Sequence, residues 1–193
     1  MQKREICSSP DFAIQKSNKY RIPTSSSIVL GATISRSVSD GKFPVLIWND
    51  PYRSGSDGNA SGMARYFAER GYAFCYLNSR GTEYSEGISI DECMAEETQD
   101  SCDAIAWLAG QPWCSDKAGR LGSFYSGFTT LQVAARTPPA LKAIAPAYFI
   151  DRRYTDDCHY KGGCLRGYYN MLTYGLSMVS RNSLPPFPEA VGG

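Results

Sequence analysis

The sequence predicts an α/β fold in which helices cover both faces of a mostly parallel sheet. Short apolar runs alternate with helical patterns along the chain, and two early strands are followed by repeated strand and helix units. The apolar runs at 43–48 and 72–77 show no polar alternation, which is typical of strands buried on both faces. With 193 residues, 42% of them hydrophobic, the chain can bury a substantial core.

The first half of the chain opens with two strands. They are predicted at 19–23 and 27–35, where β-branched and apolar residues lie on either side of a Ser-rich turn, and this gives an antiparallel start. A helix is predicted over 61–70, because apolar residues recur there at helical spacing and the pattern stops at Gly71. The buried strand at 72–77 follows directly.

The second half repeats the strand and helix alternation. A longer helix is predicted over 91–110, with acidic residues early and Gly110 as its stop. A short strand at 119–123 leads into a helix at 127–136, and the last predicted strand is 141–150. The chain beyond it changes character, since it is rich in Tyr, Gly and Asn and has a Pro-rich end.

The segment LGSFYSGF at 121–128 has the frame of a nucleophile elbow with a phenylalanine at its apex. In a G-x-S-x-G elbow, small residues two positions before and after the apex allow the strand and the helix to approach each other. Around Phe124 these flanks are Gly122 and Ser126. Neither Ser123 nor Ser126 fits as the apex, because each would then have bulky flanks. We expect Phe124 to have a strained backbone with a positive φ.

Charge and hydropathy exclude several classes of partner. The 20 basic and 19 acidic residues are dispersed and give a formal net charge of +1, so no nucleic-acid or anionic-membrane partner is expected. The N-terminal stretch lacks the apolar segment of a signal peptide, and the longest apolar run, 143–150, is far shorter than a bilayer span. These features predict a cytoplasmic protein.

The cysteines form an odd set without a C-x-x-C pair, and we interpret them as reduced thiols. One cluster, Cys158, His159 and Cys164, could supply three metal ligands. A structural zinc site usually needs four ligands with paired short spacings, so we favour the interpretation that these three residues bind no metal. The seven positions are Cys7, Cys75, Cys93, Cys102, Cys114, Cys158 and Cys164.

Four segments follow one another in a recognisable order: FPVLIWNDPYR at 43–53, NSRGTEYSEG at 78–87, QPW at 111–113 and GRLGSFYSG at 119–127. They resemble the Pro-Tyr loop, the D-x-R-G-x-x-x-S-x-G signature, the Q-P-W motif and the elbow of one family. This family comprises the α/β-hydrolases that include cocaine esterase, related acyl esterases and acylases, and Xaa-Pro dipeptidyl-peptidases. The resemblance covers about residues 19–163, and Asn78 stands where the signature has Asp.

The resemblance implies an α/β-hydrolase fold, with 1–150 as the N-terminal part of the core and 151–193 as the beginning of a helical cap. It implies acyl transfer from small ester, amide or peptide substrates to a serine, with a Ser, Asp, His triad and no cofactor. It also assigns the oxyanion hole to the phenol of Tyr52 and the backbone N–H of Tyr125. Without the resemblance, the favoured interpretation of Tyr52 is a packed loop aromatic with a solvated hydroxyl.

Two departures from the family pattern argue against activity. Phe124 has no nucleophilic atom, and loss of the serine from a comparable triad costs roughly six orders of magnitude in turnover. The predicted elements also end at the sixth strand, whereas the family's acid and base follow the seventh and eighth. We therefore expect a core truncated after the sixth strand, with an aggregation-prone edge at 141–150.

His159 is the chain's single histidine and lies beside Asp156 and Asp157. Adjacent residues seldom hold an acid and a base in triad geometry, so a structural role is favoured over catalysis. A similar histidine occurs in the D-x-H-Y-x-G-G stretch of the family, matching 157–163, and it is not the family's catalytic base.

Three interpretations of function remain open. The leading one is an incomplete member of a serine hydrolase family that is inactive because Phe124 replaces the nucleophile and the acid and base are absent. The second is a ligand-binding or partner-binding pseudo-enzyme in which Phe124 forms an apolar floor. The third is a fragment without an independent role. The sequence leaves the substrate and the oligomeric state undetermined.

Overall fold

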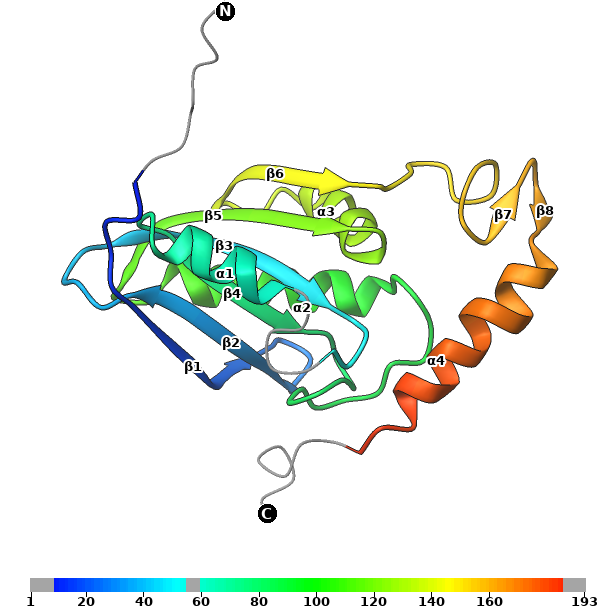
Figure 1. Ribbon diagram of the computed structural model, residues 1–193, viewed down its shortest axis with the longest axis horizontal. Helices are drawn as coiled ribbons and strands as arrows, with labels where there is room; N and C mark the ends of the chain where they lie inside the picture. The colour runs from blue at the N-terminus through cyan, green and yellow to red at the C-terminus, as the bar shows by residue number, and fades with distance from the viewer. Residues whose placement is uncertain (1–8, 55–59, 186–193) are drawn as a thin grey trace, which may run out of the picture.

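Six strands form one mixed sheet in the order β1-β2-β4-β3-β5-β6 (Figure 1). The computed structural model describes residues 9–54 and 60–185. The strands of this sheet are β1 Ile14–Pro23, β2 Val29–Ser37, β3 Phe43–Asp50, β4 Ala73–Asn78, β5 Cys114–Ser123 and β6 Leu141–Ala147. The helices packed on it are α1 Ser61–Ala68, α2 Ala95–Ala109 and α3 Tyr125–Ala135. The α/β prediction is confirmed.

Helices lie on both faces of the sheet, as predicted. On one face α2 and α3 bury a core with the odd-numbered side chains of β4, among them Cys75 and Leu77. On the other face Ala64 of α1, and Ala60 directly before this helix, pack against Phe74 and Tyr76 of the same strand. Every residue of β4 is therefore buried, which explains why its sequence shows no polar alternation.

The register of the sheet brings four strand ends to one edge. β1 with β2 and β2 with β4 are antiparallel, while β3 pairs parallel to β4 and β5, and β5 parallel to β6. The carboxyl ends of β3, β4, β5 and β6 consequently point the same way, toward the C-terminal segment in Figure 1. Ligand sites in parallel α/β sheets lie at this edge.

Several element boundaries differ from the prediction. The helix predicted over 91–110 begins only at Ala95, because Cys93 has a φ of 56° and Met94 is extended. The strand predicted over 141–150 ends at Ala147, because Tyr148 has a φ of 48°. β1 starts at Ile14 instead of 19 because it continues to pair with β2 beyond an irregularity between Ser17 and Tyr20.

β6 lies at one edge of the sheet, opposite β1, and most of its side chains are exposed, Ile144 among them. The carbonyl of Ala147 accepts the N–H of Phe124, so the backbone polar groups of Ala147 point toward β5. Those of its neighbour Pro146 point to the opposite side, away from the sheet. Proline has no N–H to donate and is tolerated at a sheet edge for this reason. The exposed edge agrees with the sequence-based expectation for this strand.

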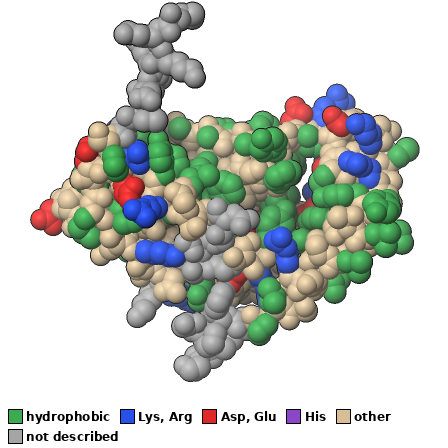
Figure 2. Space-filling model, in the orientation of Figure 1, with side chains coloured by type: hydrophobic (Ala, Val, Ile, Leu, Met, Phe, Trp, Pro, Cys, Tyr) green, Lys and Arg blue, Asp and Glu red, His purple; other side chains and the backbone are tan. Residues whose placement is uncertain are grey.

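The C-terminal segment comprises the hairpin β7 Tyr160–Lys161 and β8 Cys164–Leu165, the π-helical turn η2 Tyr169–Tyr174 and α4 Gly175–Asn182. No residue of η2 or α4 is fully buried. Its exposed hydrophobic side chains include Tyr168, Met171 and Val179. The space-filling view shows hydrophobic side chains on the surface of the molecule at the right of Figure 2. Among the described residues, no helix is both long and apolar enough to cross a membrane.

Candidate functional site

The chain turns from β5 into α3 at Phe124, which has φ 54° and ψ −119°. This is the strained, positive-φ apex that the sequence predicts, and the elbow geometry is confirmed. Gly122 is required there, because a Cβ on it would lie 2.5 Å from Ser126. Ser126 itself is buried and donates its hydroxyl to the carbonyl of Asn49, so the helix start is fastened to β3.

A buried arginine supports the elbow from below. Arg120 of β5 donates from Nε to the hydroxyl of Thr130 at 3.2 Å and from Nη2 to that of Thr129 at 3.1 Å. Burial lowers the pKa of its guanidinium to about 10, and the carboxylate of Glu97 partly offsets this effect. The strand that enters the turn and the helix that leaves it are therefore tied together.

The side chain of Phe124 projects away from the protein core into a cavity of about 720 Å³. The ring is 65% exposed and stacks on Tyr148 at a centroid distance of 5.7 Å. Aromatic side chains form much of the cavity wall, including Trp48, Tyr52 and Tyr174. The apex position thus presents a phenyl ring where an elbow presents a nucleophile.

Tyr125, directly after the apex, is held by its side chain as well as by its backbone. Its hydroxyl donates to Oε2 of Glu97 at 2.8 Å and accepts the N–H of Cys93 at 2.7 Å. The other oxygen of Glu97 accepts from Asn49 Nδ2 at 3.1 Å and from Ser79 Oγ at 2.9 Å. One buried carboxylate therefore connects the ends of β3 and β4 to the first residue of α3.

Tyr52 lies in the loop after β3 and lines the same cavity. Its ring packs edge-on against Tyr125 at 5.9 Å, and the guanidinium of Arg181 lies 5.2 Å from its centroid. Burial, together with the negative charges of Glu92 and Asp50, raises the pKa of the Tyr52 phenol. The phenol is consequently a neutral hydrogen-bond donor at physiological pH. The structure thus brings Tyr52, Phe124 and Tyr125 together.

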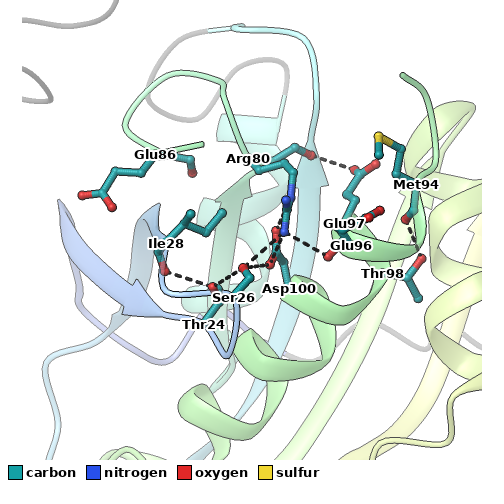
Figure 3. A network of polar contacts seen from close by, with 12 residues as sticks. Thr24, Ser26, Ile28, Arg80, Glu86, Met94, Glu96, Glu97, Thr98 and Asp100 are labelled. Atoms are coloured by element: carbon teal, nitrogen blue, oxygen red, sulfur yellow. Dashed lines mark hydrogen bonds and ion pairs between the residues drawn. The ribbon is translucent and has the colours of Figure 1, made fainter. Parts of the chain in front are cut away.

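The NSRG segment after β4 is anchored to α2 (Figure 3). Arg80 forms a bidentate ion pair with the nearly buried carboxylate of Asp100, at 2.7 and 2.8 Å. Ser26 of the first turn also donates to Asp100, at 3.2 Å. Figure 3 shows Arg80 between this turn and the helix, with Glu97 one turn earlier. The arginine of the signature therefore positions the loop and does not line the cavity.

A polar cluster around Glu92 attaches the C-terminal segment to the loop before α2. Its carboxylate accepts from Arg153 and from the hydroxyl of Tyr174, and Nε2 of His159 lies 3.6 Å away. Nδ1 of His159 is hydrogen-bonded to the side chain of Asn170. These contacts support the structural role proposed for His159 on sequence grounds.

The described residues contain no group of three His, Cys, Asp or Glu side chains placed to hold a metal ion. Cys158 and Cys164 are exposed free thiols, and the other described cysteines are free as well. Cys7 lies outside the described residues. Cys93 and Cys158 line the cavity, and desolvation, which is only partial at Cys158, raises the pKa of their thiols to about 12 and about 11 respectively. Neither is an activated nucleophile.

The profile of the X-Pro dipeptidyl-peptidase (S15) family matches residues 26–185, which is most of the chain. The chain belongs to the X-Pro dipeptidyl-peptidase (S15) family. The elbow, the Tyr52 loop and the Arg80 segment all lie within the matched region. The resemblance recognised from the four sequence motifs, and the α/β-hydrolase fold that it implies, are confirmed.

Individual relatives give the same assignment. Cocaine esterase from Rhodococcus sp. (strain MB1 Bresler) is 29% identical over 175 residues, covering 86% of this chain and 30% of that protein. A CocE/NonD family hydrolase from Staphylococcus aureus superposes with a TM-score of 0.76 at 22% identity, covering 88% and 33% of the two chains. An aminopeptidase from the marine sediment archaeon Thaumarchaeota archaeon gives a TM-score of 0.73 at 20% identity, covering 95% and 34%.

The two structural matches support the fold alone, because their identities are low. The chain spans 15% to 30% of the length of the curated relatives it matches.

Sequence reasoning identified the S15 motifs but missed the side chains that support them. Glu97 and Glu92 carried no signal beyond the acidic start of a helix. The hydroxyl of Tyr125 was given no role, although it joins α3 to α2. A carboxylate in the first turn of α2 facing a tyrosine 28 residues later is a contact that only the folded chain reveals.

Proposed function

We propose that this site binds small ester, amide or peptide ligands, as expected for the S15 family, without transferring their acyl group. The observation that carries the proposal is the phenyl ring of Phe124, exposed in the cavity at the apex of a well-formed elbow. Acyl transfer in this fold requires an oxygen nucleophile at that atom position.

No other side chain at the elbow takes over the role. Ser126 is buried and its hydroxyl is engaged by Asn49, while Ser123 lies within β5 before the turn. His159, the chain's only imidazole, is engaged by Asn170 and Glu92. Ser123, Ser126 and His159 therefore supply neither a nucleophile nor a general base.

Two donors support recognition of a carbonyl oxygen. The backbone N–H of Tyr125 belongs to the first turn of α3, where amide groups point out of the helix and the helix dipole favours negative charge. The phenol of Tyr52 lines the same cavity and stays protonated. In this proposal the two donors bind the carbonyl oxygen of the ligand. The stacked rings of Phe124 and Tyr148 form an apolar surface for the group attached to that carbonyl.

The choice of ligand class follows the relatives. By their names, one relative acts on cocaine and the family acts on X-Pro peptides. We further propose that residues 151–193 are the beginning of a cap over the site, since the segment that follows β6 supplies Tyr174 and Arg181 to the cavity wall.

Two measurements on the purified chain test the proposal. A fluorophosphonate probe is expected to leave the chain unlabelled under conditions that label cocaine esterase stoichiometrically. Titration with phenyl acetate is expected to change the fluorescence of Trp48 in the cavity, and a Trp48→Phe variant identifies that signal. Stoichiometric labelling at any serine, or the absence of saturable binding, contradicts the proposal.

A further inference from the structure

Asp50, the last residue of β3, folds the following loop back onto itself. Its carboxylate is buried, and Oδ2 accepts the backbone N–H groups of Tyr52 and Ser54, both at 3.3 Å. Oδ1 accepts the hydroxyl of Ser54 at 3.4 Å. Arg53, between these residues, has a φ of 50°, which a non-glycine residue adopts only where its surroundings impose it. The hydrogen bonds from one carboxylate supply that constraint.

The conformation of this loop decides where the Tyr52 ring lies. The ring sits between Tyr125, the first residue of α3, and Arg181 of α4. Arg53 donates to the carbonyl of Leu184 and, at 3.0 Å, to that of Gly81, so the loop also contacts the C-terminal segment and the loop after β4. A loop that opened around Arg53 would withdraw the Tyr52 phenol from the cavity.

Asn78 is the direct neighbour of Asp50 in the parallel register of β3 and β4. It is also buried, and among the residues that the structure describes neither its side-chain oxygen nor its nitrogen has a hydrogen-bond partner. A second carboxylate at position 78 would lie beside the first, and like charges in a buried site hinder each other's ionisation. The neutral amide therefore leaves Asp50 free to ionise.

We propose that Asp50 is the positioning residue of this site: its carboxylate fixes the loop that directs the Tyr52 phenol into the cavity, and the neutral Asn78 beside it permits that charge. The role of the phenol in ligand binding rests on the function proposed above. The role of Asp50 in placing the ring does not.

The groups that face Asp50 and Tyr52 determine how the test is read. Burial raises the pKa of Asp50, and the phenols of Tyr52 and Tyr76 that face it have pKa values raised by burial and by its charge. The thiols of Cys93 and Cys158 are likewise raised, to about 12 and about 11. Below pH 7, Asp50 and Glu92 are the carboxylates whose charge acts on Tyr52.

The test places 3-fluorotyrosine at position 52 and follows its ¹⁹F resonance between about pH 3.5 and 7, around the ordinary range for carboxyl groups. The wild-type resonance is expected to titrate with a midpoint above the ordinary aspartate value. In Asp50→Asn, which keeps an acceptor oxygen, the resonance should stay near the high-pH position and lose the step that Asp50 causes. Any smaller pH-dependent change that remains should disappear when Glu92→Gln is added, because Glu92 is the other carboxylate whose charge acts on Tyr52. In Asp50→Ala the resonance should be displaced at every pH. Glu92→Gln, the matched control, should retain the titration.

A titration that persists in Asp50→Asn and disappears in Glu92→Gln overturns the proposal, as does an Asp50→Ala spectrum identical to wild type. If Asp50→Ala fails to fold, the comparison of Asp50→Asn with Glu92→Gln still decides. Phenyl acetate affinity is the separate readout, with a roughly fivefold weaker Kd expected for a folded Asp50→Ala. Absence of binding by the wild type contradicts the proposed function and leaves the ¹⁹F result intact.

Discussion

Glycine at position 124 is expected to make the chain more stable than alanine at the same position. Phe124 has a φ of 54° and a ψ of −119°, a region that costs a residue with a Cβ about 1 to 3 kcal/mol. Alanine retains this strain because it retains the Cβ, whereas glycine adopts the conformation freely. The comparison omits the phenyl ring, which both variants lack.

The size of the difference follows from two opposing effects. Relief of strain contributes about 2 kcal/mol at the centre of its range, and the greater freedom of glycine in the unfolded chain subtracts about 0.4 to 1 kcal/mol. Glycine is therefore favoured by about 1 kcal/mol, which corresponds to a Tm higher by about 2 to 4 °C for a chain of this length.

Urea unfolding of both variants measures the difference, and Phe128 provides the matched control. It lies inside α3, where glycine is expected to be less stable than alanine by about 1 kcal/mol. Glycine should thus be more stable than alanine at position 124 and less stable than alanine at position 128. An alanine variant at 124 that equals or exceeds the glycine variant in stability would refute the strained elbow.

Three further outcomes are expected. Phe124→Ser should not turn over p-nitrophenyl acetate appreciably, because a hydroxyl without a general base is a weak nucleophile at neutral pH; turnover that His159→Ala then abolishes would identify His159 as the base. Asp50→Asn should gain stability relative to wild type as the pH rises from about 4 to 7.

The reason is that burial raises the pKa of Asp50 in the folded chain, so its favourable contribution, complete below the unfolded pKa, is lost as the pH rises toward the folded one. Urea unfolding curves that stay parallel across this range would contradict it. Ile144→Lys on the exposed face of β6 should reduce self-association, which light scattering measures. A wild-type chain that is monomeric at high concentration would contradict the prediction that the β6 edge causes self-association.

Local patterns were sufficient to predict the framework of the fold. The apolar runs of β3 and β4 lack polar alternation, which was sufficient to predict buried strands. The small residues on either side of Phe124 were sufficient to predict the elbow. The irregular ends were less accessible to sequence reasoning. Cys93 and Tyr148 have a positive φ, and the N–H of Cys93 donates to the hydroxyl of Tyr125 while the ring of Tyr148 stacks on Phe124, both distant in sequence. Nothing in the sequence indicates the pairing of Asp50 with Asn78, which arises from the register of two strands joined through α1.

The hydrogen bonds that hold the site together could not be predicted from the sequence for the same reason. Glu97 reads as an ordinary acidic residue near a helix N-terminus, where it is favoured by the helix dipole. Its carboxylate instead joins β3, the loop after β4 and α3. Such buried networks combine residues distant in sequence, and local propensity carries no information about them.

Binding and turnover of one ester in one sample test the central claim most directly. The chain is incubated with phenyl acetate, saturation-transfer NMR reports contact of the ester with the protein, and the acetate signal in the same spectra reports hydrolysis. Saturation transfer to the intact ester that weakens in Phe124→Ala, with acetate accumulating no faster than in buffer, is the predicted result. Catalytic release of acetate by the wild-type chain would contradict the account.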